Sequence, residues 1–417
     1  MKYLVFLVIA IQISLKVVSQ DFTFKEKKEL SGYSDYIMDA RFSPFRNYFA
    51  ITIGNNTLEI YDKDWKKVFT HQGNPKSVGG QISFSPDEKF LAYAKYKSDN
   101  DIAIIRLEDK KVVQVLNGHA QNINKVEFSH NGKYLASTSS DNAVCIWLWK
   151  DEQLILLQKF IYDDSSVGVS FSYDDKYIVT GGYNKKVYLY QLKAEKYDLI
   201  DSIAVKYWQN DVCFHPSEYE FVTSSLYEVR RYNLDKQKIK LSDTLILYVN
   251  HKVKYNSTGE YLVFGKNQDV VILDMTKDKM RVFENIYRHG DYVFGGNFSD
   301  DGKFLTTFSS DKTCIVWELT GIEPSRKSLI AEYMSSELTS AQKIILTSGV
   351  IENILKNLDE SLVLPRDEFE TTIQFNDRKS KLKSEVLALL QFYTEKHYGI
   401  KSKVPGKVII PVERVIG

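Results

Sequence analysis

Two groups of side chains in this sequence contain the residue types of a hydrolytic triad. Each group has a histidine, a hydroxyl residue and an aspartate, and a tryptophan follows six residues after the aspartate. The groups are His119, Ser137, Asp141 and Trp147, and His289, Thr307, Asp311 and Trp317. A histidine between a hydroxyl and a carboxylate is the arrangement that activates a nucleophile for acyl transfer. Because the whole group occurs twice at one spacing, a recurring element of the chain is expected to carry it.

The recurring element is an aromatic residue that closes an apolar strand, followed by a polar turn and two more apolar strands. It occurs seven times, with its aromatic anchor at Phe42, Phe84, Phe128, Phe171, Phe214, Tyr255 and Phe298. The separations are 42, 44, 43, 43, 41 and 43 residues. A fixed period of this size predicts a repeat architecture.

The third copy shows the repeat unit most clearly. Residues 126–129, 134–137 and 144–147 are rich in β-branched and aromatic residues, which predicts strands. Polar clusters with Asn-Gly or Asp-Asn lie between them and predict tight hairpin turns. Each copy therefore supplies three strands and a fourth that leads to the next copy. Seven such units bury their faces when they are arranged radially.

Residues 22–320 resemble the WD-repeat β-propeller family. The third and seventh copies carry the family's full pattern, in which the histidine precedes the anchor by nine residues and the tryptophan follows the turn aspartate by six. The resemblance implies that the histidine, hydroxyl, aspartate and tryptophan form a structural hydrogen-bond tetrad that performs no chemistry. Such a buried polar chain is tolerated when every member has a partner.

The other five copies depart from this pattern and are expected to lack the tetrad. Copies one and four have Asn55 and Asn184 at the turn position and Tyr61 and Tyr190 at the tryptophan position. Copy two has a lengthened turn at residues 96–101, copy five a shortened one near residues 226–227, and copy six ends in Leu273-Asp274. The strand pattern persists in all of them.

The predicted fold is an all-β seven-bladed propeller with a small, mostly α-helical C-terminal appendage. We predict three parts: a signal peptide-like or anchor segment at residues 1–19, the propeller at 20–321, and the appendage at 322–417. The strand-like residues 22–25 lack three partner strands of their own. We therefore expect them to complete blade seven and so remove the last open sheet edge.

The appendage is predicted from helical spacing of apolar residues near residues 329–338, 351–358 and 382–393. Its charge is divided, because residues 323–377 hold 5 basic and 10 acidic side chains whereas residues 378–417 hold 9 basic and 3 acidic ones. The basic cluster at residues 378–383 suits an acidic partner, a membrane surface or the acidic half of the same appendage.

The N-terminus and the cysteines favour different compartments. A basic start, an apolar run at residues 3–15 and small residues before position 20 resemble a secretory signal peptide cut after Ser19. An uncleaved membrane anchor through residues 3–18 and a packed apolar strand remain open alternatives. Three cysteines without paired spacing fit predicted strands in a reducing, cytoplasmic setting better than a disulfide framework. Of three glycosylation sequons, at Asn55, Asn256 and Asn297, the last lies in a predicted inner strand and should be unusable.

Composition and motif searches limit the function. The 55 basic and 54 acidic side chains give no bulk electrostatic bias, so nucleic acid is not the expected partner. The sequence has no nucleophile-elbow motif and no zinc-ligand spacing. We expect no enzyme activity, no cofactor and no metal, and the sequence does not indicate a small-molecule ligand.

The resemblance implies a scaffold that presents rim loops to protein partners in a multiprotein complex. The candidate contact residues lie in turns longer than the fold requires, and they are Tyr96, Asp99, Asp101, Tyr207 and Trp208. Two alternatives are a ligand-binding or enzymatic propeller of the secretory pathway and a membrane-tethered organiser of a complex.

Overall fold

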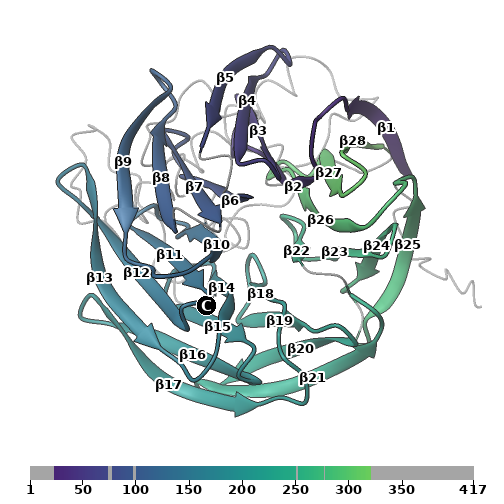
Figure 1. Cartoon of the computed structure of the whole chain (residues 1–417). Helices are drawn as coiled ribbons and strands as arrows, with labels where there is room; N and C mark the ends of the chain where they lie inside the picture. The colour runs from purple at the N-terminus through teal and green to yellow at the C-terminus, as the bar shows by residue number, and fades with distance from the viewer. Residues whose placement is uncertain (1–22, 74–77, 97–99, 250–251, 277, 321–417) are drawn as a thin grey trace, which may run out of the picture.

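The computed structural model of the protein describes residues 23–73, 78–96, 100–249, 252–276 and 278–320. Its 28 strands form seven four-stranded antiparallel sheets arranged as blades around a common centre (Figure 1). The prediction of an all-β seven-bladed propeller is therefore confirmed. The predicted N-terminal segment and C-terminal appendage lie outside the described residues.

The first four blades each consist of four consecutive strands that follow one another from the centre of the ring outward. Blade one comprises β2 (Ile37–Phe42), β3 (Tyr48–Ile53), β4 (Thr57–Asp62) and β5 (Lys67–Gln72). Blade two comprises β6 (Val78–Phe84), β7 (Phe90–Tyr96), β8 (Asp101–Arg106) and β9 (Lys111–Asn117). Blade three comprises β10 (Ile123–Phe128), β11 (Tyr134–Ser139), β12 (Ala143–Lys150) and β13 (Gln153–Ile161). Blade four comprises β14 (Ser166–Phe171), β15 (Tyr177–Gly182), β16 (Lys186–Lys193) and β17 (Lys196–Ala204).

The remaining three blades close the ring. Blade five comprises β18 (Asp211–Phe214), β19 (Glu220–Ser224), β20 (Glu228–Asp235) and β21 (Lys238–Ile246). Blade six comprises β22 (Val253–Tyr255), β23 (Tyr261–Lys266), β24 (Asp269–Asp274) and β25 (Arg281–Tyr287). Blade seven comprises β26 (Val293–Phe298), β27 (Phe304–Ser309), β28 (Cys314–Thr320) and, from the other end of the chain, β1 (Thr23–Leu30).

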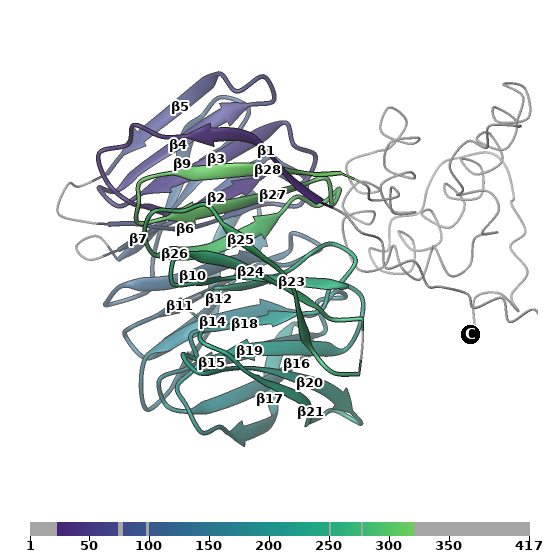
Figure 2. The same ribbon diagram turned by 90° about the vertical axis from the view of Figure 1, so that its right-hand side faces the viewer.

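The connections between strands lie on two opposite faces of the ring, because the four strands of a blade run antiparallel from the centre outward. We call one the turn face. It carries the turns between the first and second strands and between the third and fourth. The opposite face, which we call the crossover face, carries the other turns and the connections from one blade to the next. Figure 2 shows the ring from the side.

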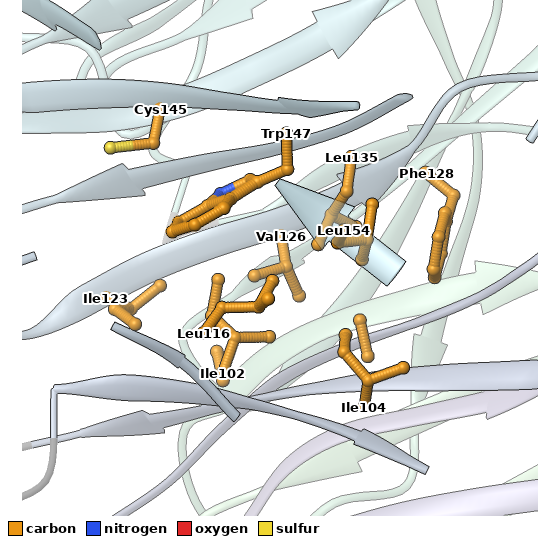
Figure 3. Close-up of a cluster of buried hydrophobic side chains, with 12 residues drawn as sticks. Ile102, Ile104, Leu116, Ile123, Val126, Phe128, Leu135, Cys145, Trp147 and Leu154 are labelled. Atoms are coloured by element: carbon orange, nitrogen blue, oxygen red, sulfur yellow. The ribbon is translucent and has the colours of Figure 1, made fainter. Parts of the chain in front are cut away.

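The seven anchor aromatics each end the innermost strand of a blade, from Phe42 in β2 to Phe298 in β26. The predicted repeat unit is thus confirmed. The core is divided into clusters that lie largely between neighbouring blades. Between blades two and three, Ile104 packs in one cluster with Val126, Phe128 and Trp147 (Figure 3). Each such side chain contributes roughly 1.5–3 kcal/mol through burial, so every blade depends on its neighbour.

The ring is closed by a strand from each end of the described chain. β1 pairs antiparallel with β28, from Thr23 opposite Thr320 to Leu30 opposite Cys314. The hydroxyl oxygens of Thr23 and Thr320 lie 2.8 Å apart at the turn face. The prediction that residues upstream of the first copy complete blade seven is confirmed for residues 23–25. This pairing gives blade seven its fourth strand, so β28 is not left as an open sheet edge.

Side chains of the outer strands tie neighbouring blades together at the perimeter. The Gln114 side chain accepts from the Leu154 N–H at 2.9 Å and donates to the Leu154 carbonyl at 2.7 Å. The equivalent side chains of the next three blades accept from the backbone N–H of the following outer strand, and they are Gln158, Asp201 and Asp243. These bonds connect sheets that share no backbone ladder.

The cysteines and the third sequon lie where the sequence predicted. Cys145, Cys213 and Cys314 are buried in strands and form no disulfide. Burial raises the pKa of the Cys145 thiol to about 12. Asn297 is buried in β26 and donates to Asp39 at 2.9 Å, so its sequon is inaccessible in the folded blade. Within the described ranges, no helix has the length and apolar character that crossing a membrane requires.

Candidate functional site

The predicted tetrads both form continuous chains of hydrogen bonds. In blade three, His119 Nδ1 lies 3.1 Å from Asp141 Oδ1, and His119 Nε2 lies 2.8 Å from Ser137 Oγ. The Trp147 indole N–H donates to the same hydroxyl oxygen at 2.9 Å. In blade seven the corresponding distances among His289, Asp311, Thr307 and Trp317 are 2.9, 2.8 and 3.0 Å.

The side chains of each tetrad are connected as in a catalytic triad, but a substrate cannot reach their hydroxyl groups. The hydroxyl residues Ser137 and Thr307 are both 0% exposed, so a substrate carbonyl cannot approach either oxygen. Burial holds the pKa of His119 below its ordinary value although Asp141 acts in the opposite direction. A neutral imidazole that donates through Nδ1 and accepts through Nε2 satisfies every member. The geometry supports the structural role that the family resemblance implies.

Replacing Ser137 with alanine tests that role. We expect Ser137→Ala to lower the free energy of unfolding by about 1–3 kcal/mol, because His119 and Trp147 both lose a buried partner. Ser140→Ala, in the adjoining turn, should change it by less than about 0.5 kcal/mol. Chemical denaturation of both variants measures the difference, and equal effects would contradict the assignment.

Blades one and four contain tyrosine networks in place of the tetrad. Tyr162 precedes its anchor by nine residues, as His119 does, and its hydroxyl lies 2.9 Å from Thr180 Oγ1 and 2.7 Å from the Tyr190 hydroxyl. In blade one, the Tyr33 and Tyr61 hydroxyls lie 3.0 Å apart. The sequence indicated Tyr61 and Tyr190, but not their partners Tyr33 and Tyr162. The signal that identifies these partners is their spacing of nine residues from the anchor.

The predicted contact residues that the structure describes lie on the crossover face but differ in exposure. Trp208 is 48% exposed in the connection between β17 and β18, and Tyr207 beside it is half-buried. Asp101 begins β8 and pairs with Lys95 at 3.0 Å, which leaves 14% of its side chain exposed. Asp99 and the Tyr96 side chain lie outside the described residues. The exposed contact surface is therefore centred on blade five.

Around Trp208, aromatic side chains of five blades form an arc on the crossover face. The arc consists of Tyr183, Tyr207, Trp208, Tyr227, Tyr248, Tyr292, Phe294 and Tyr36. Ring centroids lie 5.7 Å apart for Tyr183 and Trp208, 4.9 Å for Tyr207 and Tyr227, and 5.6–5.7 Å where Phe294 meets Tyr292 and Tyr36. Burial raises the pKa of Tyr292 to about 12, and the nearby Tyr248 adds to this rise. Tyr248 precedes the first strand of blade six and Tyr292 precedes that of blade seven, so the two tyrosines lie close to each other across neighbouring blades. Of these eight residues, the sequence alone indicated Tyr207 and Trp208.

Four members of the arc are substantially exposed: Tyr183, Trp208, Tyr227 and Tyr248 are 39–49% exposed. The loop that presents Tyr207 and Trp208 is held in place by Gln209, which is 1% exposed. The Gln209 side chain donates to the Tyr207 carbonyl at 2.7 Å, and its backbone N–H donates to the Gly182 carbonyl at 3.0 Å. The loop that carries the exposed Trp208 ring is therefore held in a fixed position.

A second polar feature surrounds the axis of the ring. Charged side chains occupy two equivalent positions on or beside the innermost strands, three residues and one residue before the anchors. The first position supplies Asp39, Lys125, Asp211 and Lys252, and the second supplies Arg41, Glu127 and Lys254. We call these seven residues the axial cluster. None of them was singled out from the sequence, although the regular spacing of the anchors locates them.

Two lysines of the axial cluster each span a blade that has glycine at the equivalent position. Lys125 of blade three passes Gly168 of blade four and reaches blade five. There its ammonium donates to Asp211 Oδ1 at 2.7 Å and to the Val212 carbonyl at 3.0 Å. A Cβ added at Gly168 would lie 2.7 Å from the Val212 nitrogen, so a larger residue there would displace the blade-five strand.

The second lysine repeats this arrangement half a turn around the ring. Lys252 of blade six passes Gly295 of blade seven and donates to the Met38 carbonyl of blade one at 2.9 Å. Its ammonium lies 3.6 Å from Asp39 Oδ2. A lysine, a glycine and an aspartate therefore follow one another in blades three to five and again in blades six, seven and one. Both bridges tie alternate blades across the centre of the ring.

The described part of the chain contains no group of three or more His, Cys, Asp or Glu side chains that could hold a metal ion. Its buried polar networks include the tetrads, the tyrosine networks and the axial cluster. The first two are buried within blades, and the third is enclosed by the innermost strands. The aromatic arc is exposed on the crossover face, and other exposed apolar side chains lie on the outer strands.

Comparison with known proteins agrees with the fold. Residues 110–147, 156–191 and 281–318 match the family model for the WD domain, G-beta repeat. These segments include the tryptophan of each tetrad and the tyrosine pair of blade four. The chain is thus a seven-bladed β-propeller in which three segments match WD repeats.

Particular relatives share parts of the propeller at low identity. The chain is 26% identical to the WD repeat-containing protein 26 homolog of Drosophila melanogaster, over 58% of this chain and 39% of that protein. It is 27% identical to a guanine nucleotide-binding protein subunit beta-like protein of Encephalitozoon cuniculi, over 47% and 58%. It is 20% identical to the nuclear distribution protein nudF of Emericella nidulans, over 70% and 61%. In each case the match spans less than two thirds of the relative's length.

Proposed function

We propose that this protein is a non-catalytic scaffold that binds protein partners in a larger complex through the aromatic arc on its crossover face. The WD-repeat relatives support a general role in protein interaction. The observation that carries the specific surface is the arc itself, with its four rings that are 39–49% exposed. Large aromatic side chains on a rigid support are enriched in the centres of protein interfaces.

The partner surface that fits the arc is apolar at its centre and polar at its edge. The tyrosine hydroxyls and the Trp208 indole N–H offer hydrogen bonds beside the apolar ring faces. Lys206 lies over the Tyr207 ring at 4.9 Å, which places a cation next to the aromatic group. A partner segment with aliphatic or aromatic side chains and an adjacent carboxylate would complement both features. Because Gln209 already holds this loop in place, ordering the loop on binding should cost little conformational entropy.

The test is a paired substitution on the arc with a matched substitution elsewhere. Trp208→Ala combined with Tyr227→Ala removes two exposed rings and should weaken binding of a specific partner by more than about 2 kcal/mol, which is about 30-fold. Tyr287→Ala is the control, because Tyr287 is 74% exposed on outer strand β25 and lies outside the arc. Quantitative co-purification of the tagged full chain from its own cells identifies the partners that depend on the arc.

The outcomes separate the proposal from simple loss of folding. The proposal predicts that the same partners are lost from the arc variant and retained by Tyr287→Ala, with equal thermal unfolding midpoints. A recombinant partner should then show the affinity difference in isothermal titration calorimetry. Unchanged partner recovery with the arc variant would reject the arc as the binding surface.

A further inference from the structure

A groove on the turn face, between blades two and three, is separate from the aromatic arc and has no part in the proposed scaffold function. Its volume is about 790 Å³, within the range of sites that hold a ligand. The lining comes from the β6–β7, β8–β9 and β10–β11 turns and from strand residues beside them. A smaller pocket of about 410 Å³ shares part of this lining and extends to blade one. We call the larger pocket the turn-face groove.

Two aromatic rings form the apolar floor of the turn-face groove. Phe90 in β7 and Trp149 in β12 belong to neighbouring blades, and their ring centroids lie 4.5 Å apart. Both rings pack against the buried cluster between blades two and three, so the core fixes their positions. Val113 of β9, which is 40% exposed, adds aliphatic surface to the lining. This floor suits the burial of an apolar side chain.

The lining of the turn-face groove has more acidic than basic side chains. Glu108 and Glu152 are exposed, and the basic side chains of the lining do not pair with them. The three basic side chains are instead engaged with other carboxylates, in the pairs Arg106–Asp109 at 2.7 Å, Lys89–Asp87 at 3.6 Å and Lys133–Glu195 at 3.2 Å. The groove therefore complements a ligand that carries positive charge beside an apolar group.

Another groove on the turn face, between blades five and six, differs in its lining. Its volume is about 660 Å³, and it also presents exposed carboxylates, at Glu218 and Glu260. Of its described lining residues, however, only Met275 has an apolar side chain. Acidic charge is thus common to both grooves, whereas the aromatic floor distinguishes the turn-face groove.

The chain itself continues from the turn face. β28 ends there at Thr320, and residues 321–417 follow. From Thr320 to Arg378 the chain advances by 58 residues (378 − 320), and an extended chain spans about 3.3 Å per residue, or ~190 Å in all. This length far exceeds the radius of gyration of about 20 Å expected of a domain of roughly 300 residues. Residues near 378 can therefore reach any groove on the turn face.

Residues 378–383 carry the chemical features that the turn-face groove complements. Four of these six residues are basic, and they are Arg378, Lys379, Lys381 and Lys383. Leu382 stands between the last two, so an apolar side chain is flanked by two ammonium groups. Residues 323–377 have the opposite balance, with 10 acidic and 5 basic side chains, and the exposed carboxylates of the groove would repel them.

We propose that residues 378–383 of this chain bind in the turn-face groove. Leu382 packs against the aromatic floor, and the flanking lysines pair with Glu108 and Glu152. Exposed ion pairs contribute little individually, so the tether to the propeller supports the contact by raising the local concentration of the segment. The contact would hold the segment on the face opposite the aromatic arc and leave the arc open to partners.

The experiment is photo-cross-linking within the full chain. Leu382 is replaced with p-benzoylphenylalanine, and the peptides joined on irradiation are mapped by mass spectrometry. A mixture of nitrogen-15-labelled and unlabelled chains distinguishes a cross-link within one chain from one between two copies. The groove variant is Glu108→Gln with Glu152→Gln. The matched control is Glu218→Gln with Glu260→Gln, which removes the same charge from the groove between blades five and six.

Trypsin provides a second measurement on the native sequence, because it cleaves after the basic residues of 378–383 and binding in the groove protects those bonds. We expect cleavage in this run to be about three- to tenfold faster in the groove variant, as the loss of two exposed ion pairs predicts. The control variant should be cleaved at the wild-type rate. Cleavage after Lys396 is the internal reference. Thermal unfolding midpoints should agree among these chains, because all four substituted glutamates are exposed.

A charge reversal on both sides of the contact tests the pairing directly. Glu108→Lys with Glu152→Lys should abolish the cross-link from position 382, and so should Lys381→Glu with Lys383→Glu. Combining the two reversals should restore it, because the opposite charges then face each other again. Failure of the combined variant to recover the cross-link would contradict the proposed pairing.

We expect the cross-links from position 382 to reach the turns and strands of the turn-face groove in the same chain. Their yield should fall at least about threefold in the groove variant and remain unchanged in the control. The proposal is overturned if the cross-links reach residues 323–377, the groove between blades five and six or a second copy, or if none forms. An equal loss in the control variant would overturn it as well. None of these results bears on the binding of partners by the aromatic arc.

Discussion

Deleting residues 23–30 is expected to abolish the cooperative unfolding of the propeller. This deletion removes β1, which pairs with β28 from Thr23 to Leu30. β28, which carries Trp317 of the blade-seven tetrad, then becomes an open edge. Ion pairs of Lys27 with Glu318 and of Arg288 with Glu26 and Glu29 are lost as well. An exposed apolar edge of this kind pairs with other chains, so we expect aggregation.

Size-exclusion chromatography with light scattering and thermal unfolding measure that effect. The matched control lacks residues 1–22 and retains β1, so the two deletions isolate the contribution of one strand. We expect the control to keep a sharp transition. A monodisperse monomer with an unchanged midpoint after loss of β1 would show that closure through this strand is not needed.

Asp39→Ala is expected to lower the free energy of unfolding by about 3–5 kcal/mol, the cost of leaving buried charges without their partner. Asp39 is 0% exposed and connects four blades. Its carboxylate accepts from Arg41 Nε at 3.1 Å, from Asn297 Nδ2 at 2.9 Å and from the Ile82 N–H at 3.3 Å. Lys252 of blade six lies 3.6 Å away.

Asp64→Ala is the control for this substitution. Asp64 pairs with Lys63 in the same blade, but its side chain is 73% exposed, so its loss should cost less than about 1 kcal/mol. Denaturant titration of the two variants gives the comparison. Equal unfolding free energies would contradict the central role of Asp39.

The stability contributed by Asp39 should also depend on pH. Burial alone would raise the pKa of Asp39, but Arg41 and Lys252 hold it below the ordinary value. A carboxyl with a lowered folded-state pKa stabilises fully above its unfolded pKa, and that stability is lost as the pH falls through the folded value. The difference between wild type and Asp39→Ala should therefore shrink in acid, below about pH 4.

The blades could be predicted from the sequence because the repeat period is a local property. An aromatic anchor every 41 to 44 residues locates each innermost strand, and the spacing of nine residues locates the tetrad histidines. The same spacing locates Tyr33 and Tyr162. The family pattern does not identify these two residues, because it specifies histidine at their position. A search for spacing without regard to residue type would have found them.

The aromatic arc and the pairings in the axial cluster depend on the ring as a whole. Tyr183, Tyr227 and Tyr248 come from separate turns, and nothing in any one turn shows that the rings meet. Likewise, the positions of Lys125 and Asp211 follow from the anchors, but their contact requires Gly168 to stand between them on the intervening blade. Three-dimensional closure decides which equivalent positions come together.

The pairing of Thr23 with Thr320 also determines how the propeller responds to force. The segments before residue 23 and after residue 320 continue from one edge of blade seven, where the two threonines meet. Tension applied between those segments would act at the end of the β1–β28 pair and open its hydrogen bonds one after another. On heating, all hydrogen bonds of the β1–β28 pair resist unfolding together, whereas under tension each bond would break in turn. The pairing that closes the ring would therefore separate before any other blade was under load.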